Sequence, residues 1–436
     1  MTQRKHFKQL VRTRMEKTGE SYATARRIVL RHAPAGDRKA IRHFAGNIPA
    51  TTALRILLTQ FGIRNPITMA PFTEEMLFGI AGGIGAGAFS FLYEKENFAC
   101  FFIAGRHMWM DDEVYLKEAC QRLGVEAVVK ESTAAKAAEK QLRETLDEFG
   151  ACIAWVDAAT LPHRAMPAMW SGGGYHLVTA YRIDDESGTV LIGDLTDEPI
   201  AISMKGLTAA RMRIKKQKNR LLAVRGEKGD RDLGKLVRSG IEACIRGLTR
   251  QRMKNFTIDA LQEWADRLHG SKDKQSWERV FTPGKRLWQG LTSIYDYIEH
   301  YGTGGGLCRP MFADSLNEAA DALNDPRLSE AASRYEELGR AWSELAKAAL
   351  HPGVPLFRKA RELFAEKAEL LAAGAPADEV RGVWTQIGKL ADQAAECFPL
   401  SDKQVVNLRI ELQQKVRALY EGERAALETL RRLVVA

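Results

Sequence analysis

The hydrophobic pattern of this 436-residue chain changes character near residue 230. Before that point, short apolar runs of strand length alternate with segments of helical periodicity, and residues 151–156 form one continuous buried strand of this kind. After it, apolar residues recur only at the spacing of amphipathic helices. A chain of this length has room for more than one domain. The pattern therefore predicts an α+β domain followed by an all-helical domain.

The helices of the second half are predicted by periodicity and by capping residues. Ser401 and Gln404 have the spacing of a capping box, which predicts the start of a last long helix that continues to about Val434. The earlier helices are expected at residues 233–252, 257–268, 284–300, 311–323, 329–350, 356–373 and 377–395.

A short basic segment precedes the α+β domain. Val11 and Met15 lie on one face of a first predicted helix, and Ser21 can cap a second helix after a break at residues 17–20. The segment therefore resembles a helical hairpin. The predicted domains are a basic helical hairpin at 1–35, an α+β domain at 36–226 and a helical domain at 227–436.

Positive charge is concentrated in two places. Residues 1–44 hold 12 basic and 3 acidic residues, and residues 205–238 hold the same numbers, although the whole chain has a net charge of only +9. Such local patches on an otherwise acidic protein indicate contacts with anions. The hairpin at 1–34 could grip nucleic-acid phosphates, dock an acidic carrier protein or remain a solvated appendage. The second patch fits the same acidic partner and consists of Lys215, Lys216, Lys218 and Arg220.

The composition excludes several protein classes. The six cysteines are widely spaced and form no motif with histidine, which argues against structural zinc and against a disulfide framework. The longest apolar runs, near residues 80–91 and 98–104, are too short or too glycine-rich to span a membrane. The N-terminus lacks the apolar stretch of a secretory signal. We therefore expect a cytoplasmic protein that has no metal, no cofactor and no membrane contact.

Residues 176–194 have the pattern of a β-hairpin that begins with His176 and ends with Asp194. A histidine and a carboxylate at one end of a hairpin can act as a base and its orienting acid. For catalysis, His176 Nδ1 should bond to Asp194, and Nε2 should face an open cleft beside Thr51. The alternative is a purely structural pair.

The helix that should present a nucleophile to His176 begins at Pro49. Proline fits the first turn of a helix, because its missing N–H has no intrahelical partner. It provides neither a nucleophilic atom nor a backbone N–H for an oxyanion. Thr51 and Thr52 are the remaining candidate nucleophiles, and their alternative roles are capping and packing.

Two glycine clusters and two cysteines have alternative interpretations. Residues 83–88 follow a helix and precede a strand, the reverse of a dinucleotide-binding turn, so close backbone approach is favoured over a phosphate site. Residues 304–306 with Arg309 could hold an anion or form a loop packed between helices. Cys152 and Cys308 have no partner histidine at a characteristic spacing, which favours roles as small apolar residues.

Several separated motifs resemble a known family. Those in the first half resemble the N-terminal domain of butirosin biosynthesis protein H. They are residues 75–85, residues 156–162, His176 and Asp194. Those in the second half resemble the uncharacterised helical domain (DUF4872) that usually follows it. They are residues 294–306, 309–314 and 318–320, and Trp342.

The resemblance implies a papain-like fold and acyl transfer in bacterial specialised metabolism. The founding member moves an aminoacyl group from a carrier-protein thioester to an amine of an aminoglycoside, so it implies an acidic acyl carrier protein and a small amine acceptor. The family places His and Cys where this chain has Ile48 and Pro49, while His176 and Asp194 match its base and orienting acid. We therefore expect either an acyltransferase with altered or lost catalysis, or a non-catalytic binding or scaffold protein. A third hypothesis, a nucleic-acid-associated regulator, is supported only by the basic hairpin.

Overall fold

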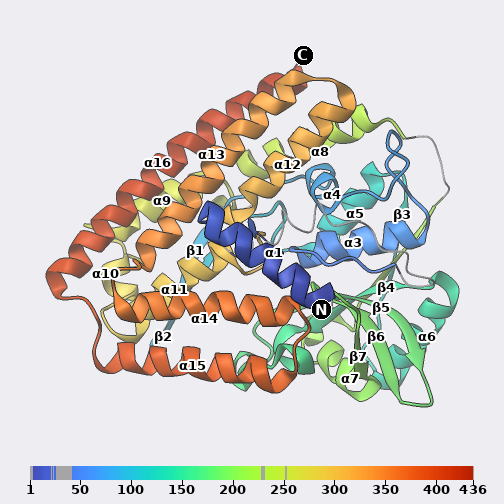
Figure 1. Cartoon of the computed structure of the whole chain (residues 1–436), viewed down its shortest axis with the longest axis horizontal. Helices are drawn as coiled ribbons and strands as arrows, with labels where there is room; N and C mark the ends of the chain where they lie inside the picture. Colours follow the sequence, from blue (N-terminus) through green and yellow to red (C-terminus); the bar gives the residue numbers. More distant parts are fainter. Residues whose placement is uncertain are drawn as a thin grey trace.

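The computed structural model describes residues 3–20, 22, 24–25, 42–226, 231–250 and 253–435. Figure 1 shows a six-stranded sheet at the lower right and long helices along the upper left, with the last helix, α16 (Asp402–Val435), at the outer edge. The first half of the chain is thus a mixture of helices and strands. In the described part of the second half, residues 231–250 and 253–435, every regular element is a helix.

The large sheet is antiparallel and has the strand order β3-β8-β4-β5-β6-β7. The sequence pattern predicted β4 (Cys152–Asp157) and the hairpin of β5 (Tyr175–Asp184) and β6 (Thr189–Gly193). The sheet also contains β3 (Glu126–Lys130) and β7 (Ile200–Ser203). The pattern missed β8 (Leu221–Arg225), which lies between β3 and β4.

Alternate residues of the central strands enter two different cores, as the two-residue period of a strand requires. Ile153 and Trp155 pack with α3 (Pro49–Gln60) and α5 (Asp112–Arg122). Cys152 and Ala154 face the opposite side and pack with α6 (Ala135–Phe149) and α7 (Met204–Met212). The sheet is therefore covered by helices on both faces.

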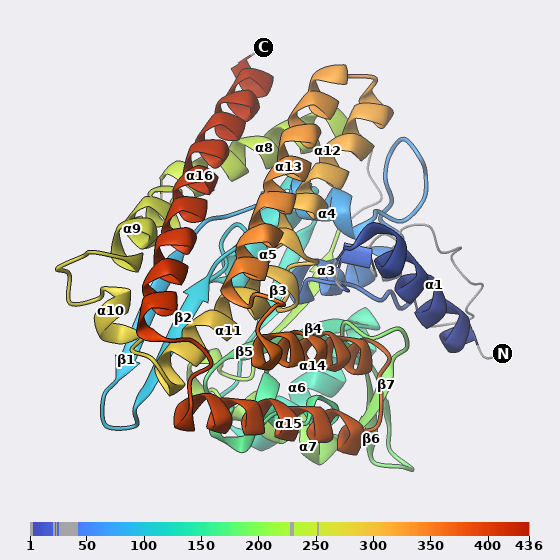
Figure 2. The ribbon, with the colours of Figure 1, turned by 60° about the vertical axis from the view of Figure 1, so that its left-hand side comes forward.

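A separate two-stranded sheet joins the first half of the chain to the helical half. Strands β1 (Ala88–Tyr93) and β2 (Phe98–Ile103) pair in antiparallel register. The inner side of the pair carries Phe101, whose ring lies 4.9 Å from Trp264 and 5.2 Å from Trp277, measured between centroids. Figure 2 shows these strands at the lower-left edge of the molecule, beside helices of the second half.

The helices of the second half follow the predicted pattern. The capping box is confirmed, because the Ser401 amide donates to Gln404 Oε1 at 2.9 Å and the Gln404 amide donates to Ser401 Oγ at 3.4 Å. The other helices are α4 (Glu74–Ile80) in the first half, and α8 (Leu233–Thr249), α9 (Asp259–Leu268), α10 (Trp277–Val280), α11 (Lys285–Glu299), α12 (Arg309–Leu323), α13 (Pro326–Ala349), α14 (Pro355–Ala372) and α15 (Ala377–Glu396) in the second.

One hydrophobic core runs from α3 to α16, across the predicted domain boundary. A buried ion pair lies within it, where Arg309 Nε donates to Glu423 Oε1 at 2.7 Å. The same guanidinium donates to the carbonyl oxygens of Leu307 at 2.8 Å and Gly85 at 3.0 Å. Arg309 is therefore a structural link between distant segments, and its donors are directed at protein acceptors instead of a bound anion.

The glycine cluster at residues 83–88 is a place of close backbone approach, as the sequence favoured. A Cβ atom on Gly85 would lie 2.3 Å from the carbonyl oxygen of Arg106. No side chain fits at that distance, so the two segments can pack only with glycine at this position.

The basic N-terminal segment packs on the helical half through α1 (Gln3–Thr18). Val11, Tyr22 and Ala25 form a small apolar cluster with residues of α14. Arg12 Nη2 lies 2.7 Å from Glu369 Oε2. The predicted second helix of the hairpin, beyond Ala25, lies outside the described residues. Among the described residues, none of the helices combines the length and apolarity that a membrane span requires.

Candidate functional site

His176 and Asp194 lie at the same end of two neighbouring strands, and the structure brings them together. His176 is the second residue of β5, opposite Val156 of β4, and Asp194 directly follows β6. His176 Nε2 lies 2.6 Å from Asp194 Oδ1. Both residues are buried, with 6% and 4% of their surfaces exposed. The hairpin therefore forms the predicted pair of imidazole and carboxylate.

The imidazole ring has the opposite orientation to the one expected. His176 Nε2 bonds to Asp194. In the arrangement expected for catalysis, His176 Nδ1 would form this bond and Nε2 would face the cleft. A carboxylate accepts a hydrogen bond, so Nε2 carries the proton and Nδ1 keeps its lone pair. No described residue forms a hydrogen bond with Nδ1. Any base function of His176 would therefore act through Nδ1.

Asp194 is shared by more donors than the sequence indicated. His163 Nε2 lies 2.9 Å and Arg164 Nη1 3.0 Å from Asp194 Oδ2, and the Leu195 amide donates to Oδ1 at 2.7 Å. His163 and Arg164 belong to a short 3-10 helix after β4. Sequence analysis missed both, although they directly follow the family-like segment 156–162. We call His163, Arg164, His176 and Asp194 the aspartate cluster.

The charges of this cluster are strongly coupled. Burial alone would raise the pKa of Asp194, but His176, Arg164 and the hydrogen bonds from the two histidines lower it well below its usual value. Burial lowers the pKa of His176, and Arg164 lowers it further, while Asp194 opposes both. The site near neutral pH therefore holds an ionised aspartate and a neutral His176.

A buried carboxyl group, that of Glu74, accepts hydrogen bonds at the head of α3. Glu74 accepts from the backbone amides of Asn47 at 3.0 Å and Ile48 at 2.9 Å, and from Thr52 Oγ1 at 2.8 Å. Burial, with Glu75 nearby, raises the pKa of Glu74. The Thr52 hydroxyl therefore has a structural partner at the helix head, where an acyltransferase would place its oxyanion.

Thr51 is also engaged in the interior. Its side chain is fully buried, and Oγ1 lies 3.1 Å from the hydroxyl oxygen of Tyr115. Burial raises the pKa of Tyr115 to about 12, so this phenol is a poor base near neutral pH. Thr51 therefore faces Tyr115 in the interior, where the sequence led us to expect an open cleft.

Residue alternation separates the aspartate cluster from the head of α3. His176 shares a face of β5 with Val178, which packs with α6 and α7. Leu177 points to the other face and packs in the core that contains α3. The structure therefore brings His176 and Asp194 together, but it gives Thr51 and Thr52 other partners.

A second polar cluster lies on the α3 side of the same strands. Arg106 pairs with Asp112 and lies 4.0 Å over the ring of Tyr115. The Asp112 amide donates to the Tyr175 hydroxyl oxygen at 3.4 Å. Tyr175 directly precedes His176, and Asp157 pairs with it across β4 and β5. The two clusters thus flank one strand end from opposite faces.

Residues of the helical half lie next to both clusters. Trp384 Nε1 of α15 donates to the carbonyl oxygen of Arg164 at 3.2 Å. A Cβ atom on Gly302 would lie 3.7 Å from Pro49 Cδ, so the loop after α11 abuts the head of α3. Tyr301, in the same loop, has Arg164 of the aspartate cluster and Asp112 and Asp157 of the second polar cluster as electrostatic neighbours.

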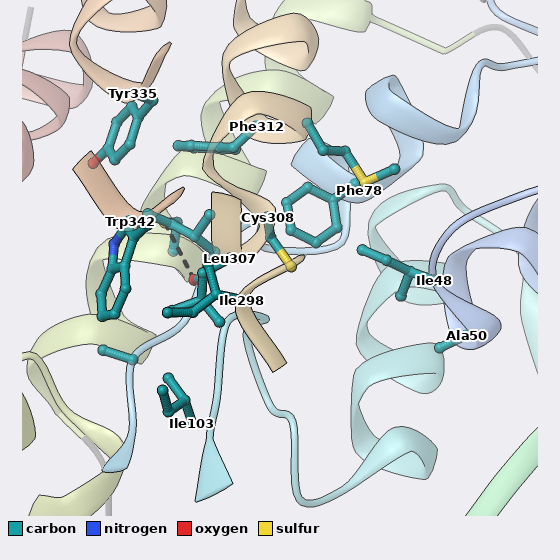
Figure 3. Close-up of a cluster of buried hydrophobic side chains, with 14 of the residues drawn as sticks. Ile48, Ala50, Phe78, Ile103, Ile298, Leu307, Cys308, Phe312, Tyr335 and Trp342 are labelled. Atoms are coloured by element: carbon teal, nitrogen blue, oxygen red, sulfur yellow. Dashed lines mark hydrogen bonds between the residues drawn. The ribbon is translucent and has the colours of Figure 1, made fainter. Parts of the chain in front are cut away.

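Both cysteines singled out in the sequence are buried. Burial raises the pKa of Cys152 and of Cys308 to about 12, so both thiols are neutral. Figure 3 shows Cys308 among the apolar side chains of a buried cluster. This environment agrees with a packing role for Cys308.

Comparisons with protein families agree with the order of the two halves. Residues 49–195 match the family described as "Butirosin biosynthesis protein H, N-terminal". Residues 205–354 match "Domain of unknown function (DUF4872)". The chain belongs to the butirosin biosynthesis protein H-like family. No curated protein sequence matches it. Trp384, which bonds to the carbonyl oxygen of Arg164, lies beyond both matched segments.

The second basic patch is largely engaged by acidic side chains. Lys218 Nζ lies 3.0 Å from Glu131, and Arg220 Nη2 lies 2.6 Å from the same carboxylate. Lys215 and Lys216 are exposed. The charge available to an acidic partner is therefore smaller than the sequence suggested.

Proposed function

We propose that this chain binds an acyl thioester on a papain-like scaffold without forming a covalent acyl–enzyme. The observation that carries the proposal is the Glu74 carboxylate, which accepts the amides of Asn47 and Ile48 at the head of α3. Covalent acyl transfer needs a thiolate and an oxyanion at such a helix head, where N–H groups stabilise negative charge. The Glu74 carboxyl group in this position uses these donors, so they are not available to an oxyanion.

Two further features support the loss of covalent chemistry. Pro49 has no nucleophilic atom and no N–H donor. The hydroxyl groups of Thr51 and Thr52 are bonded to Tyr115 and Glu74, which leaves neither next to the imidazole of His176. A hydroxyl group without an adjacent base is a weak nucleophile near neutral pH.

The proposed donor is an acyl group attached to an acidic carrier protein. Lys215 and Lys216 are exposed and are close in sequence to Arg213, which donates to Ser171 at 2.7 Å. Opposite charge on a carrier would guide its encounter with this edge of the protein. Salt should weaken carrier binding, because exposed charges are screened.

A second candidate function is direct transfer of the acyl group to a small amine. It is favoured by His176, whose Nδ1 has a lone pair and whose ring is neutral near pH 7. In this reaction the amine nitrogen would attack the thioester carbonyl, and His176 Nδ1 would take the amine proton. The carbon–sulfur bond would break, and the leaving thiolate would receive that proton. General-base catalysis of this kind contributes about 10²–10⁴-fold.

Intact-mass and thiol-release measurements distinguish the two candidates. The protein and its His176→Ala variant would be incubated with an aminoacyl-N-acetylcysteamine thioester and a panel of amines, while calorimetry follows thioester binding. The proposal expects binding, no mass adduct and the same background thiol release for both proteins. An adduct on Thr51 or Thr52, or no binding at all, would overturn it. Thiol release lost in His176→Ala would establish direct transfer instead.

A further inference from the structure

Five of the six residues on the outer face of the β1–β2 hairpin are aromatic. Phe89 pairs with Phe102, Phe91 with Cys100, and Tyr93 with Phe98 across the two strands. The residues between them point inward, as the alternating burial shows. Phe91 and Tyr93 are each 50% exposed. A strand face exposed to water normally carries polar side chains, so this face has the composition of a binding surface.

Aromatic contacts continue this face toward the aspartate cluster on one side. The Phe102 ring lies 5.6 Å from Tyr297, which lies 5.3 Å from Tyr301. Tyr301 is 39% exposed and has Arg164 of the aspartate cluster as an electrostatic neighbour. The aromatic surface therefore leads toward the aspartate cluster.

A second path joins the face to the other polar cluster. The Phe98 ring lies 5.7 Å from Trp170, which is 42% exposed. The next residue, Ser171, donates to Asp157 Oδ2 at 3.2 Å and accepts from Arg213 at 2.7 Å. The aromatic surface thus touches both the polar site and the edge that carries the exposed lysines. We call the outer side chains of β1 and β2, with Trp170 and Tyr301, the aromatic platform.

We infer that the aromatic platform binds a planar aromatic acyl group of the thioester, an inference that rests on the proposed function. A planar group gains stacking and edge-to-face contacts on a one-sided aromatic surface. A flexible alkyl chain loses more conformational entropy on ordering and gains little unless a groove encloses it. The platform is one side of an exposed hairpin, so the chemistry favours a rigid aromatic ligand.

Calorimetry with inert probes tests this inference separately from catalysis. The probes are S-(2-naphthylmethyl)-, S-(decahydronaphthylmethyl)- and S-methyl-N-acetylcysteamine thioethers, which have no carbonyl group to react. The naphthyl probe should bind at least about tenfold more tightly than the other two, a difference of about 1.4 kcal/mol. Tyr93→Ser and Trp170→Ser should each reduce that preference by about threefold or more, since each ring contributes stacking.

The matched control is Val406→Ser on α16, which removes an apolar side chain of comparable exposure, 40%, from a helix outside the aromatic platform. It should leave the preference unchanged, and all variants should keep the wild-type unfolding midpoint. Equal binding of the naphthyl and decahydronaphthyl probes, or an unchanged preference in both platform variants, would overturn the inference. Self-association in sedimentation runs that the platform variants abolish would assign the face to a second copy and also overturn it. A measurement of thioester turnover does not affect this result, because turnover tests only the proposed function.

Discussion

The aspartate cluster and the head of α3 contain the residues that the sequence assigned to one active site, but they differ in what their polar groups face. In the aspartate cluster, three side chains converge on Asp194, and no residue in the described part of the chain bonds to His176 Nδ1. At the head of α3, the hydroxyl groups of Thr51 and Thr52 face internal partners. The comparison shows that several donors hold the carboxylate of the predicted pair in place, whereas internal hydrogen bonds occupy the predicted hydroxyl groups.

The largest expected effect follows from removing the shared carboxylate. Asp194→Ala should lower the free energy of unfolding by about 3–5 kcal/mol, because Arg164 would remain buried without its counter-ion. Urea denaturation monitored by circular dichroism measures this. Asp185→Ala, at the exposed hairpin turn, is the control and should change stability by no more than about 0.5 kcal/mol. A loss below about 1 kcal/mol in Asp194→Ala would show that the aspartate cluster is not an essential part of the fold.

A smaller loss is expected at the helix head. Glu74→Ala should destabilise the protein by about 1–3 kcal/mol, because the amides of Asn47 and Ile48 would lose their acceptor in a buried position. Burial raises the pKa of Glu74, so its charge contributes less than its hydrogen bonds. Glu74→Gln keeps an acceptor oxygen and should cost less than half as much in the same denaturation experiment. Equal losses would mean that the negative charge itself is what stabilises this helix head.

The pH dependence of stability should come mainly from the aspartate cluster, through His176. The folded pKa of His176 lies below 6.5, so the unfolded chain binds a proton first as the pH falls. The free energy of unfolding should therefore decrease below pH 6.5, until His176 is protonated in the folded state as well. The depressed pKa of Asp194 adds a further loss in stronger acid.

Unfolding between pH 4 and pH 8 tests this expectation in His176→Gln, whose stability should decrease less with acid. His300 contributes to the same window, because burial lowers its pKa to about 4. The comparison is therefore best made in a His300→Gln background. An identical slope with and without His176 would show that its protonation is not linked to folding.

The smallest change in stability is expected for Pro49→Cys, which should stay within about 1 kcal/mol of the parent protein. This variant restores a thiol and an N–H at the head of α3, yet Glu74 still occupies the neighbouring donors. We expect no acyl adduct in intact-mass spectra with a thioester, and an adduct only in the Pro49→Cys, Glu74→Gln double variant. An adduct in the single variant would show that proline alone suppresses the covalent chemistry.

Local patterns predicted most of the fold because they depend on neighbouring residues. The helical spacing after residue 230, the Ser401 capping box and the hairpin at residues 176–194 each depend on residues that are close in the sequence. Strand β8 was missed because its four buried residues, 221–224, are too few to show a period and lie inside a basic patch. Its place between β3 and β4 is set by packing, which a single short run does not reveal.

The site was predicted only in part for the same reason. His176 and Asp194 belong to one hairpin, so their pairing follows from local structure. The orientation of the imidazole ring, the approach of His163 and Arg164 and the contact with Trp384 depend on segments that are distant in the sequence. Thr51 and Thr52 were weighed against capping and packing, and their observed hydrogen-bond partners agree with that alternative.

The buried pair of Arg309 and Glu423 has a consequence for how the protein is made. Arg309 holds the carbonyl oxygen of Gly85, and its counter-ion Glu423 lies 338 residues after Gly85 in the sequence. The ribosome must therefore synthesise the chain as far as residue 423 before this charge can be neutralised. The N-terminal half should remain incompletely folded during most of its synthesis, and a stop codon before residue 423 should abolish the whole structure, including the distant aspartate cluster.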